Sequence, residues 1–327
     1  MQSRLINDPF SDPGLYVDFR FGRRALLFDL GDVTALSARE LMRISDVFVS
    51  HAHMDHFAGF DRLLRLCLHR PQPLHLVGPD DFADRVEHRL RSYTWNLLGP
   101  DSTDFRLRVS NVTGDRIASV TEFRSQEGFR RYAVEAPALA PGCVLAEEQF
   151  RVEAVALDHR IPSLAFALTE PVRVNVWQGA LEPLGLPVGA WLNEAKRAVR
   201  LGLPDETDVL VPPDRQISLG TLREKVFRVG PGQKIAYITD AGFTEANIEK
   251  IVALADGADQ LFIEAAFLDA DAGLAAERRH LTAAQAGRLG RRAGVRHLTP
   301  FHFSARYLDR PDALANEARS AFAGLAP

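Results

Sequence analysis

The chain has 327 residues, of which 46% are hydrophobic and 25% are charged, as in an ordinary globular protein with room for one large domain or two modest ones. Its formal net charge of −4 argues against a surface that coats nucleic acid generally, but it leaves room for a local basic patch. Cys67 and Cys143 are the only cysteines, which excludes a disulfide framework and a thiolate zinc finger.

We expect no targeting signal at the N-terminus. Its first residues, MQSRLINDPF, lack the basic and then apolar segments of a signal peptide. No run of about 20 uncharged apolar residues predicts a membrane span. The expected compartment is therefore the cytoplasm.

The first hundred residues predict strands that alternate with helices. Strand-forming residues and short apolar runs predict the strands, and apolar residues at helical spacing predict the helices. Residues 51–56 are therefore expected in a strand-to-helix connection. The predicted strands are two around a turn at Gly22 within 14–32, one at 45–50 and one at 73–79; the predicted helices are 57–68 and 80–93.

The middle of the chain changes character twice. Residues 100–160 look β-rich, with strands expected at 106–112 and 150–159 and another at 163–170. From 172 to 235, prolines interrupt the pattern, and only 189–202 looks helical. We interpret 172–235 as an inserted arm or irregular lobe within a single domain of residues 1–327.

The last hundred residues again alternate, which favours an α/β architecture. Strands are predicted at 234–240, 260–265 and 295–302, and helices at 244–255 and 282–294.

The segment HAHMDH, residues 51–56, holds four metal-capable side chains within six positions. His51 and His53 project to the same side of an extended segment. Asp55 and His56 follow as the chain turns, so the unit is able to serve two ions. Imidazole and carboxylate donors suit zinc, and also manganese or iron. The alternative, a hydrogen-bonded core histidine cluster, accounts poorly for this spacing.

Further ligands are expected because a divalent ion takes four or more donors. His159, Asp240 and His302 each end a predicted strand, and functional groups of open α/β sheets gather at such ends. For each of them a structural role is the alternative. His69, His75, His88 and His297 are expected to be core or surface residues.

The order of short motifs resembles the ribonuclease Z branch of the metallo-β-lactamase superfamily. HAHMDH is similar to the histidine signature of the superfamily. Five later segments occur in the order found in ribonuclease Z: LDHRIPSLAFAL (157–168), YITDAG (237–242), FIEAAF (262–267), RHLTAAQAG (279–287) and LTPFHFSARY (298–307).

The resemblance implies a four-layer αββα sandwich with an inserted arm and a site for two divalent metal ions, with Zn²⁺ the first choice and Mn²⁺ or Fe²⁺ the alternatives. It also implies a homodimer and a precursor tRNA substrate. The implied ligands are His51, His53 and His159 for one ion, Asp55, His56 and His302 for the other, and Asp240 as the bridge.

The resemblance further implies a catalytic His280 and a glutamate-bearing loop at Glu264. Asp55 is the expected orienter or base for water, and Glu264 is expected to hold His280 in one tautomer. For Glu264 the alternative is a strand-end carboxylate that pairs with an arginine. The segment LGLPVGAW (184–191) is similar to the Gly-Pro element of the exosite arm of the family.

Two segments depart from the pattern of the family. LINDPFSDPGLYVDF (5–19) stands where a glycine-rich first strand and turn are usual, and DLGDVTALS (29–37) replaces a Cys-Gly-Glu-Gly-Thr-type segment. The arm at 172–235 mixes acidic residues with its basic ones.

Thr282 and Gln285 have the spacing of a capping box at a helix start. This predicts free backbone N–H groups after His280, where a phosphate would be favoured. Basic residues of the same helix would meet further phosphates; they are Arg288, Arg291 and Arg292. The alternative is a capped helix with a solvated basic face.

Three functions remain open. The first is a two-metal phosphodiesterase of ribonuclease Z type that cuts near the tRNA 3′ end. The second is a hydrolase on the same scaffold that acts on a small phosphodiester, sulfate ester or lactone without tRNA activity. The third is a non-catalytic RNA- or partner-binding module, which predicts eroded metal ligands.

Overall fold

The computed structural model describes residues 1–19 and 24–325, and the turn predicted at Gly22 lies outside them. The chain divides into two compact units, which are described separately. The first comprises Met1–Val144, Val152–Ala167 and Ile235–Pro327, and the second comprises Leu145–Arg151 and Leu168–Lys234.

One sheet of the first unit contains the N-terminal strands in sequence order. Pairing is antiparallel from β1 to β3, parallel from β3 to β6 and antiparallel from β6 to β8. The sequence predicted β2 to β6 and missed β1, β7 and β8. The strands are β1 (Gln2–Leu5), β2 (Leu15–Phe19), β3 (Arg24–Phe28), β4 (Ile44–Phe48), β5 (Leu74–Pro79), β6 (Arg106–Thr113), β7 (Arg116–Arg124) and β8 (Arg130–Val134).

The other sheet has the order β18-β17-β16-β11-β10-β9, and β16 to β18 are parallel. All of its strands except β9 were predicted. They are β9 (Cys143–Ala146), β10 (Arg151–Asp158), β11 (Pro162–Thr169), β16 (Lys234–Ile238), β17 (Gln260–Glu264) and β18 (His297–Phe301).

Aromatic side chains join the two sheets. Phe28 and Phe48 stack with centroids 5.0 Å apart, and each packs on Phe166 of the other sheet, at 5.7 and 5.6 Å. Tyr237 lies 5.9 Å from Phe28. Because side chains alternate along a strand, Leu27 faces the opposite way, into the core under the N-terminal helices.

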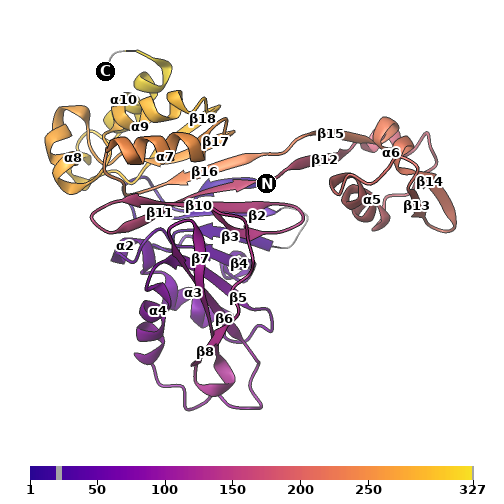
Figure 1. The fold of residues 1–327 in the computed structure, drawn as a ribbon, viewed down its shortest axis with the longest axis horizontal. Helices are drawn as coiled ribbons and strands as arrows, with labels where there is room; N and C mark the ends of the chain where they lie inside the picture. The colour runs from indigo at the N-terminus through magenta and orange to yellow at the C-terminus, as the bar shows by residue number, and fades with distance from the viewer. Residues whose placement is uncertain (20–23, 326–327) are drawn as a thin grey trace. The chain divides into compact units, whose positions relative to one another are not determined.

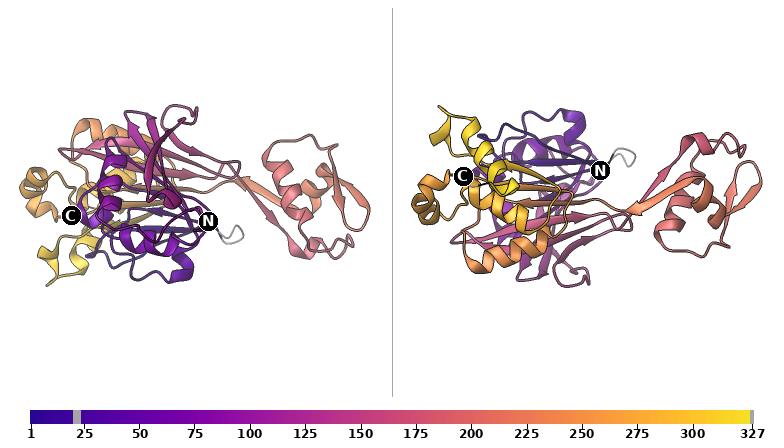
Figure 2. Two further views of the ribbon diagram at one scale, coloured as in Figure 1. Left: turned by 90° about the horizontal axis from the view of Figure 1, so that it is seen from below. Right: turned by 90° about the horizontal axis from the view of Figure 1, so that it is seen from above.

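Helices cover the outer faces of both sheets (Figure 1). In Figure 2 the C-terminal helices lie in front when seen from above and the N-terminal ones when seen from below. The expected four-layer αββα sandwich is confirmed. The N-terminal helices are α1 (Ala38–Leu41), α2 (Met54–Phe57), α3 (Phe60–Cys67) and α4 (Phe82–Arg91); the C-terminal ones are α7 (Glu245–Ala255), α8 (Ala272–Arg278), α9 (Ala283–Arg292) and α10 (Asp312–Ala323).

The second unit is ordered, and its longer segment nearly coincides with residues 172–235, where the sequence predicted an inserted arm or irregular lobe. Strands β12 and β15 pair with each other, as do β13 and β14, and α5 and α6 pack over a core that includes Trp191, Leu219 and Phe227. The prolines lie mainly between short elements. These are β12 (Val172–Val176), α5 (Trp191–Arg200), β13 (Asp208–Val211), β14 (Arg215–Ser218), α6 (Leu219–Lys225) and β15 (Phe227–Pro231).

Neither a disulfide nor a membrane-spanning helix occurs among the residues that the structure describes. Cys67 and Cys143 are both buried, and no disulfide joins them. Among residues 1–19 and 24–325, every helix is too short or too polar to cross a bilayer.

The buried carboxylate of Asp46 is expected to make the free energy of unfolding depend on pH. Burial opposes its ionisation, but hydrogen bonds and charge from His75 and Arg24 lower its pKa to about 2. A carboxylate whose folded-state pKa lies below its unfolded value stabilises the fold only while it is ionised. We expect Asp46→Asn to lower the free energy of unfolding by about 2 kcal/mol at neutral pH.

This difference should shrink as the pH falls from about 4 to about 2, where the wild-type carboxylate takes up its proton. Urea unfolding of both proteins across this range measures it. A difference that stays constant with pH would contradict the role of the Asp46 charge.

Candidate metal centre

The predicted site residues converge because the strands that precede them end at one edge of the sandwich. Asp240 and His302 follow the parallel strands β16 and β18, and Glu264 ends β17 between them. His51 follows β4 of the other sheet, and His159 follows β10.

The HAHMDH segment turns from strand to helix at His53, which has extended backbone and precedes α2. Asp55 and His56 therefore lie in the first turn of helix, at the end of the strand-to-helix connection expected for residues 51–56. The amide of Leu30 donates to the carbonyl of His56 at 2.9 Å. Gly31 is required beside it, since a Cβ there would lie 2.3 Å from the carbonyl oxygen of Asp55.

Besides a group that joins Asp240 to Glu264, His280 and His302, two further groups of possible metal ligands lie around Asp240. Donor atoms of His51, His53 and His159 lie within 4.8 Å of one another and of Asp240. Donor atoms of a separate group lie within the same distance of one another: Asp55, His56 and His302.

The carboxylate of Asp240 lies between the two groups. Its Oδ2 is 3.6 Å from Nε2 of His51 and 3.4 Å from Nε2 of His159. Its Oδ1 is 3.5 Å from Nε2 of His56 and 3.2 Å from Nδ1 of His302. Each oxygen thus faces a different group.

Hydrogen bonds outside the cluster fix the ring orientations. Nδ1 of His159 bonds to the carbonyl of Arg279 at 2.8 Å, and Nδ1 of His51 lies 3.0 Å from Oγ of Ser50. Bonding at Nδ1 leaves Nε2 of each ring directed at Asp240. Metal-binding histidines are usually held in this way.

Asp29, at the end of β3, performs this task for His56, and the sequence analysis missed it. Its carboxylate accepts from Nδ1 of His56 at 2.8 Å, from the hydroxyl of Tyr237 at 2.8 Å, and from the amide and hydroxyl of Ser50 at 2.7 and 3.0 Å. Asp29 is fully buried. Its position after a predicted strand was the only signal available.

Glu264 and His280 form a second pair beside the cluster. Oε2 of Glu264 accepts from Nδ1 of His280 at 2.8 Å, while Oε1 accepts from the amides of Ala241 and Leu281. No arginine pairs with Glu264 among the described residues, so the alternative of a simple ion pair is wrong. The pair leaves Nε2 of His280 available to the cavity.

The charges of the site favour cations. Burial opposes ionisation of Asp55, Asp240 and Glu264, but the adjacent histidines outweigh it and lower the pKa of each carboxyl. Burial lowers the pKa of His51 to about 2, which keeps this imidazole neutral and able to donate a lone pair. Burial also opposes protonation of His302, but Asp240 raises its pKa to about 10.

The donor set fits divalent metal ions. Nε2 of His56 and Nδ1 of His302 are buried and have no hydrogen-bond partner among the described residues. Buried nitrogens without a hydrogen bond are costly, and a cation would satisfy both. Imidazole nitrogens and carboxylate oxygens are the donors that zinc, manganese and iron accept.

The phosphate site predicted at the start of α9 is not available. The capping box of Thr282 and Gln285 is confirmed. The next amides are nevertheless bonded: that of Leu281 to Glu264, that of Ala283 to the carbonyl of Phe267, and that of Ala284 to Glu317. The prediction of free N–H groups after His280 is therefore wrong.

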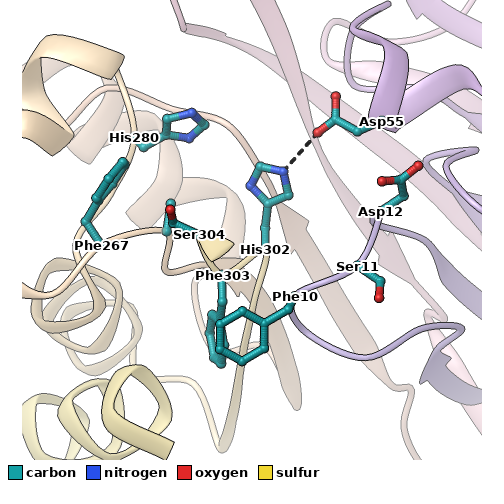
Figure 3. Close-up of a pocket in the computed structure, with 10 residues that line it drawn as sticks. Phe10, Ser11, Asp12, Asp55, Phe267, His280, His302, Phe303 and Ser304 are labelled. Carbon is teal, nitrogen blue, oxygen red and sulfur yellow. Dashed lines mark hydrogen bonds and ion pairs between the residues drawn. The ribbon is translucent and has the colours of Figure 1, made fainter. Parts of the chain in front are cut away.

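A cavity of about 270 Å³ opens beside the cluster (Figure 3). Asp55, His280 and His302 line it together with an N-terminal loop that the sequence analysis did not consider. From this loop Asp12 contributes another carboxylate, whose pKa is raised by burial and by the charge of Asp55. The cavity is large enough for part of a nucleotide.

Comparison with known proteins agrees with this geometry. The model of a beta-lactamase superfamily domain matches residues 223–303. Ribonuclease Z of Deinococcus radiodurans is 32% identical over 312 residues, which are 94% of this chain and 91% of the relative. Ribonuclease Z of Nocardia farcinica is 33% identical over 313 residues, 93% of this chain and 86% of the relative.

Solved structures show the same fold. Human tRNase Z, short form, matches with a TM-score of 0.53 at 19% identity, with 94% of each chain covered. The metallo-beta-lactamase fold protein YhfI of Bacillus subtilis also matches with a TM-score of 0.53, at 15% identity, and covers 96% of this chain and 86% of its own. With similarity to ribonuclease Z over nearly its whole length, this chain belongs to the ribonuclease Z family of the metallo-β-lactamase superfamily.

Proposed function

We propose that this protein is a two-metal endoribonuclease that cleaves precursor tRNA at its 3′ end. The observation that carries the proposal is the buried Asp240, whose two oxygens face two different groups of histidines. Membership of the ribonuclease Z family supports RNA as the substrate.

The ligand assignment follows the two groups, and Asp240 is assigned to both because its Oδ1 also lies near His56 and His302. Two divalent cations so held would supply Lewis acidity to a phosphodiester and would lower the pKa of water. The ligands are His51, His53 and His159 for one ion and Asp55, His56 and His302 for the other.

Asp55 is suited to orient the attacking water and to accept its proton. Its carboxylate lines the cavity and accepts from Nε2 of His302 at 3.2 Å. The side chain is 42% exposed, so water reaches it. Its position at the edge of the cluster joins the ions to the space where substrate binds.

His280 is suited to donate a proton to the leaving oxygen. Burial opposes its charge, but Glu264 raises the pKa of the imidazole, which favours the protonated form. Because Nδ1 is held by Glu264 at 2.8 Å, the proton transferred is that on Nε2. Glu264 thus acts through His280.

We also propose that residues 172–235 act as an exosite for tRNA. On α5, burial and the nearby Arg200 lower the pKa of Lys196, and a phosphate would relieve this repulsion. Arg228 lies 5.1 Å from the ring centroid of the exposed Trp177, and such a cation–aromatic pair suits single-stranded RNA.

We further propose that the bound metal is Zn²⁺, that the protein is a homodimer and that it is located in the cytoplasm. The imidazole-rich donor set supports Zn²⁺. Two buried thiols without a disulfide support a reducing compartment. The dimer depends on the resemblance alone.

Removing the charge of Asp29 should weaken metal binding. We expect Asp29→Asn to raise the Kd for Zn²⁺ roughly 10- to 100-fold, since partners of metal-binding histidines contribute on this scale. Titration of metal-free protein with Zn²⁺ measures it.

Asp32→Asn is the matched control, because it removes the same charge from an exposed position three residues away. Tyr237→Phe removes one donor to Asp29 and should have a smaller effect. Unchanged affinity in folded Asp29→Asn would contradict its positioning role.

His280→Ala should retain bound metal but slow turnover by roughly 10²- to 10⁴-fold, the usual contribution of general acid–base catalysis. The imidazole lies outside the two proposed ligand groups, so metal content separates this effect from loss of the ions. Elemental analysis together with single-turnover rates checks both expectations. An unchanged rate would remove His280 from the mechanism.

The substrate is tested by comparing a precursor tRNA with bis(p-nitrophenyl) phosphate. We expect the metal-loaded protein to cleave the RNA endonucleolytically near its 3′ end and also to hydrolyse the dye ester. Asp240→Ala, expected to lose metal and most activity, is the inactive control.

Two other outcomes of these measurements would each favour a different function. Hydrolysis of the dye ester without RNA cleavage would favour a hydrolase of small esters. Less than one equivalent of bound transition metal after repletion would favour a non-catalytic binding module.

A further inference from the structure

One wall of the cavity is a short N-terminal loop, residues 7–14, held rigidly in place. The amide of Phe303 donates to the carbonyl of Pro9 at 2.7 Å, and the rings of Phe10 and Phe303 meet edge to face at 5.2 Å. Nδ2 of Asn7 donates to the carbonyl of Asp12 at 2.8 Å. Pro9 and Pro13 restrict the backbone further. The wall is therefore preformed.

The loop directs a carboxylate into the cavity beside the metal cluster. Asp12 and Asp55 lie on one side of the cavity, Phe267 and His280 lie on the other, and His302 lies between them (Figure 3). Within residues 1–19 and 24–325, no hydrogen bond reaches the Asp12 carboxylate, and none of the groups with metal-binding geometry includes it. Its oxygens are available to a bound molecule.

The chemistry of this group limits what it can recognise. An ionised carboxylate only accepts hydrogen bonds, so it repels a phosphate and binds a donor. In RNA the donor nearest a 3′-linked phosphate is the 2′-hydroxyl, on the neighbouring carbon of the same ribose. Carboxylates bind ribose hydroxyls in nucleotide-binding folds, and the 2′-hydroxyl distinguishes RNA from DNA.

We propose that Asp12 accepts a hydrogen bond from the 2′-hydroxyl of the nucleotide on the 5′ side of the scissile phosphate. Asp12 is thereby a specificity-determining residue that selects ribose next to the cleaved bond. The inference rests on the proposed RNA cleavage and deepens it.

A coupling experiment tests the contact. Wild type, Asp12→Ala and Asp12→Asn are assayed with a precursor tRNA and with the same RNA carrying one 2′-deoxynucleotide 5′ of the cleavage site. Hydrogen bonds to charged groups predict that the deoxy substitution lowers kcat/KM of the wild type roughly 10-fold or more. Asp12→Ala should show a similar loss on the all-ribose RNA and little further loss on the deoxy RNA.

Two comparisons sharpen the result. Asp12→Asn keeps an acceptor oxygen and should retain part of the sensitivity to the deoxy substitution. Asp101→Ala, which removes the same charge from an exposed loop, should behave as wild type on both RNAs. The loss in Asp12→Ala should be larger on RNA than on bis(p-nitrophenyl) phosphate, which has no ribose.

The outcomes separate this inference from the proposed function. RNA cleavage with full deoxy sensitivity retained in Asp12→Ala would overturn the contact alone. A faster Asp12→Ala on every substrate would also overturn it, since the carboxylate would then merely repel phosphate. A wild-type protein that hydrolyses the dye ester but no RNA would refute the proposed function, and this inference with it.

Discussion

The buried carboxylate of Asp240 is the group on which the site depends. It is 2% exposed, and four histidines from three separate segments face its two oxygens. A buried charge is tolerated only where opposite charge or hydrogen-bond donors compensate it. With two cations bound, as proposed, one carboxylate would satisfy both and fix the distance between the two ligand groups. The sandwich supplies the constraint, because the two sheets must end at the same edge for these segments to meet.

The backbone at this edge is held in conformations that other residues avoid. Asp29, Asp240 and His302 have φ values of 56°, 25° and 59°, in the left-handed region that normally favours glycine. Such conformations persist only where the surroundings enforce them. Here the side chains are fixed by the hydrogen bonds of Asp29 and the contacts of Asp240, and the adjacent strands fix the chain on one side. Unfavourable backbone geometry is thus concentrated where donor atoms need exact directions.

The surroundings of three carboxylates in and beside the cavity suit them to different roles. Glu264 is wholly buried and bonded to His280 and to two amides, so it is suited to positioning and not to contact with substrate. Asp55 and Asp12 have the same chemistry but face the cavity. Asp55 lies in the metal cluster, whereas Asp12 lies on the N-terminal loop outside it.

Patterns among neighbouring residues in the sequence predicted much of the secondary structure and indicated the metal site. Alternation and helical spacing predicted most strands of both sheets and several helices, and HAHMDH indicated a metal site, because these signals depend on residues that are neighbours in the chain. The capping box of Thr282 and Gln285 is likewise local and correct. The tertiary structure alone decided that the amides of Leu281, Ala283 and Ala284 are unavailable, because their acceptors come from other segments: Glu264, Phe267 and Glu317.

Contacts between distant segments also explain the other features that the sequence did not predict. Asp29 and Asp12 have no neighbouring motif, and their roles arise only when β3 and the N-terminal loop pack beside His56 and His302. The prolines of residues 172–235 mark turns, but the core that orders the second unit joins residues far apart in sequence. Residue spacing along the chain determines periodicity and short motifs, whereas hydrogen-bond partners and cavity walls depend on which distant segments the fold brings together.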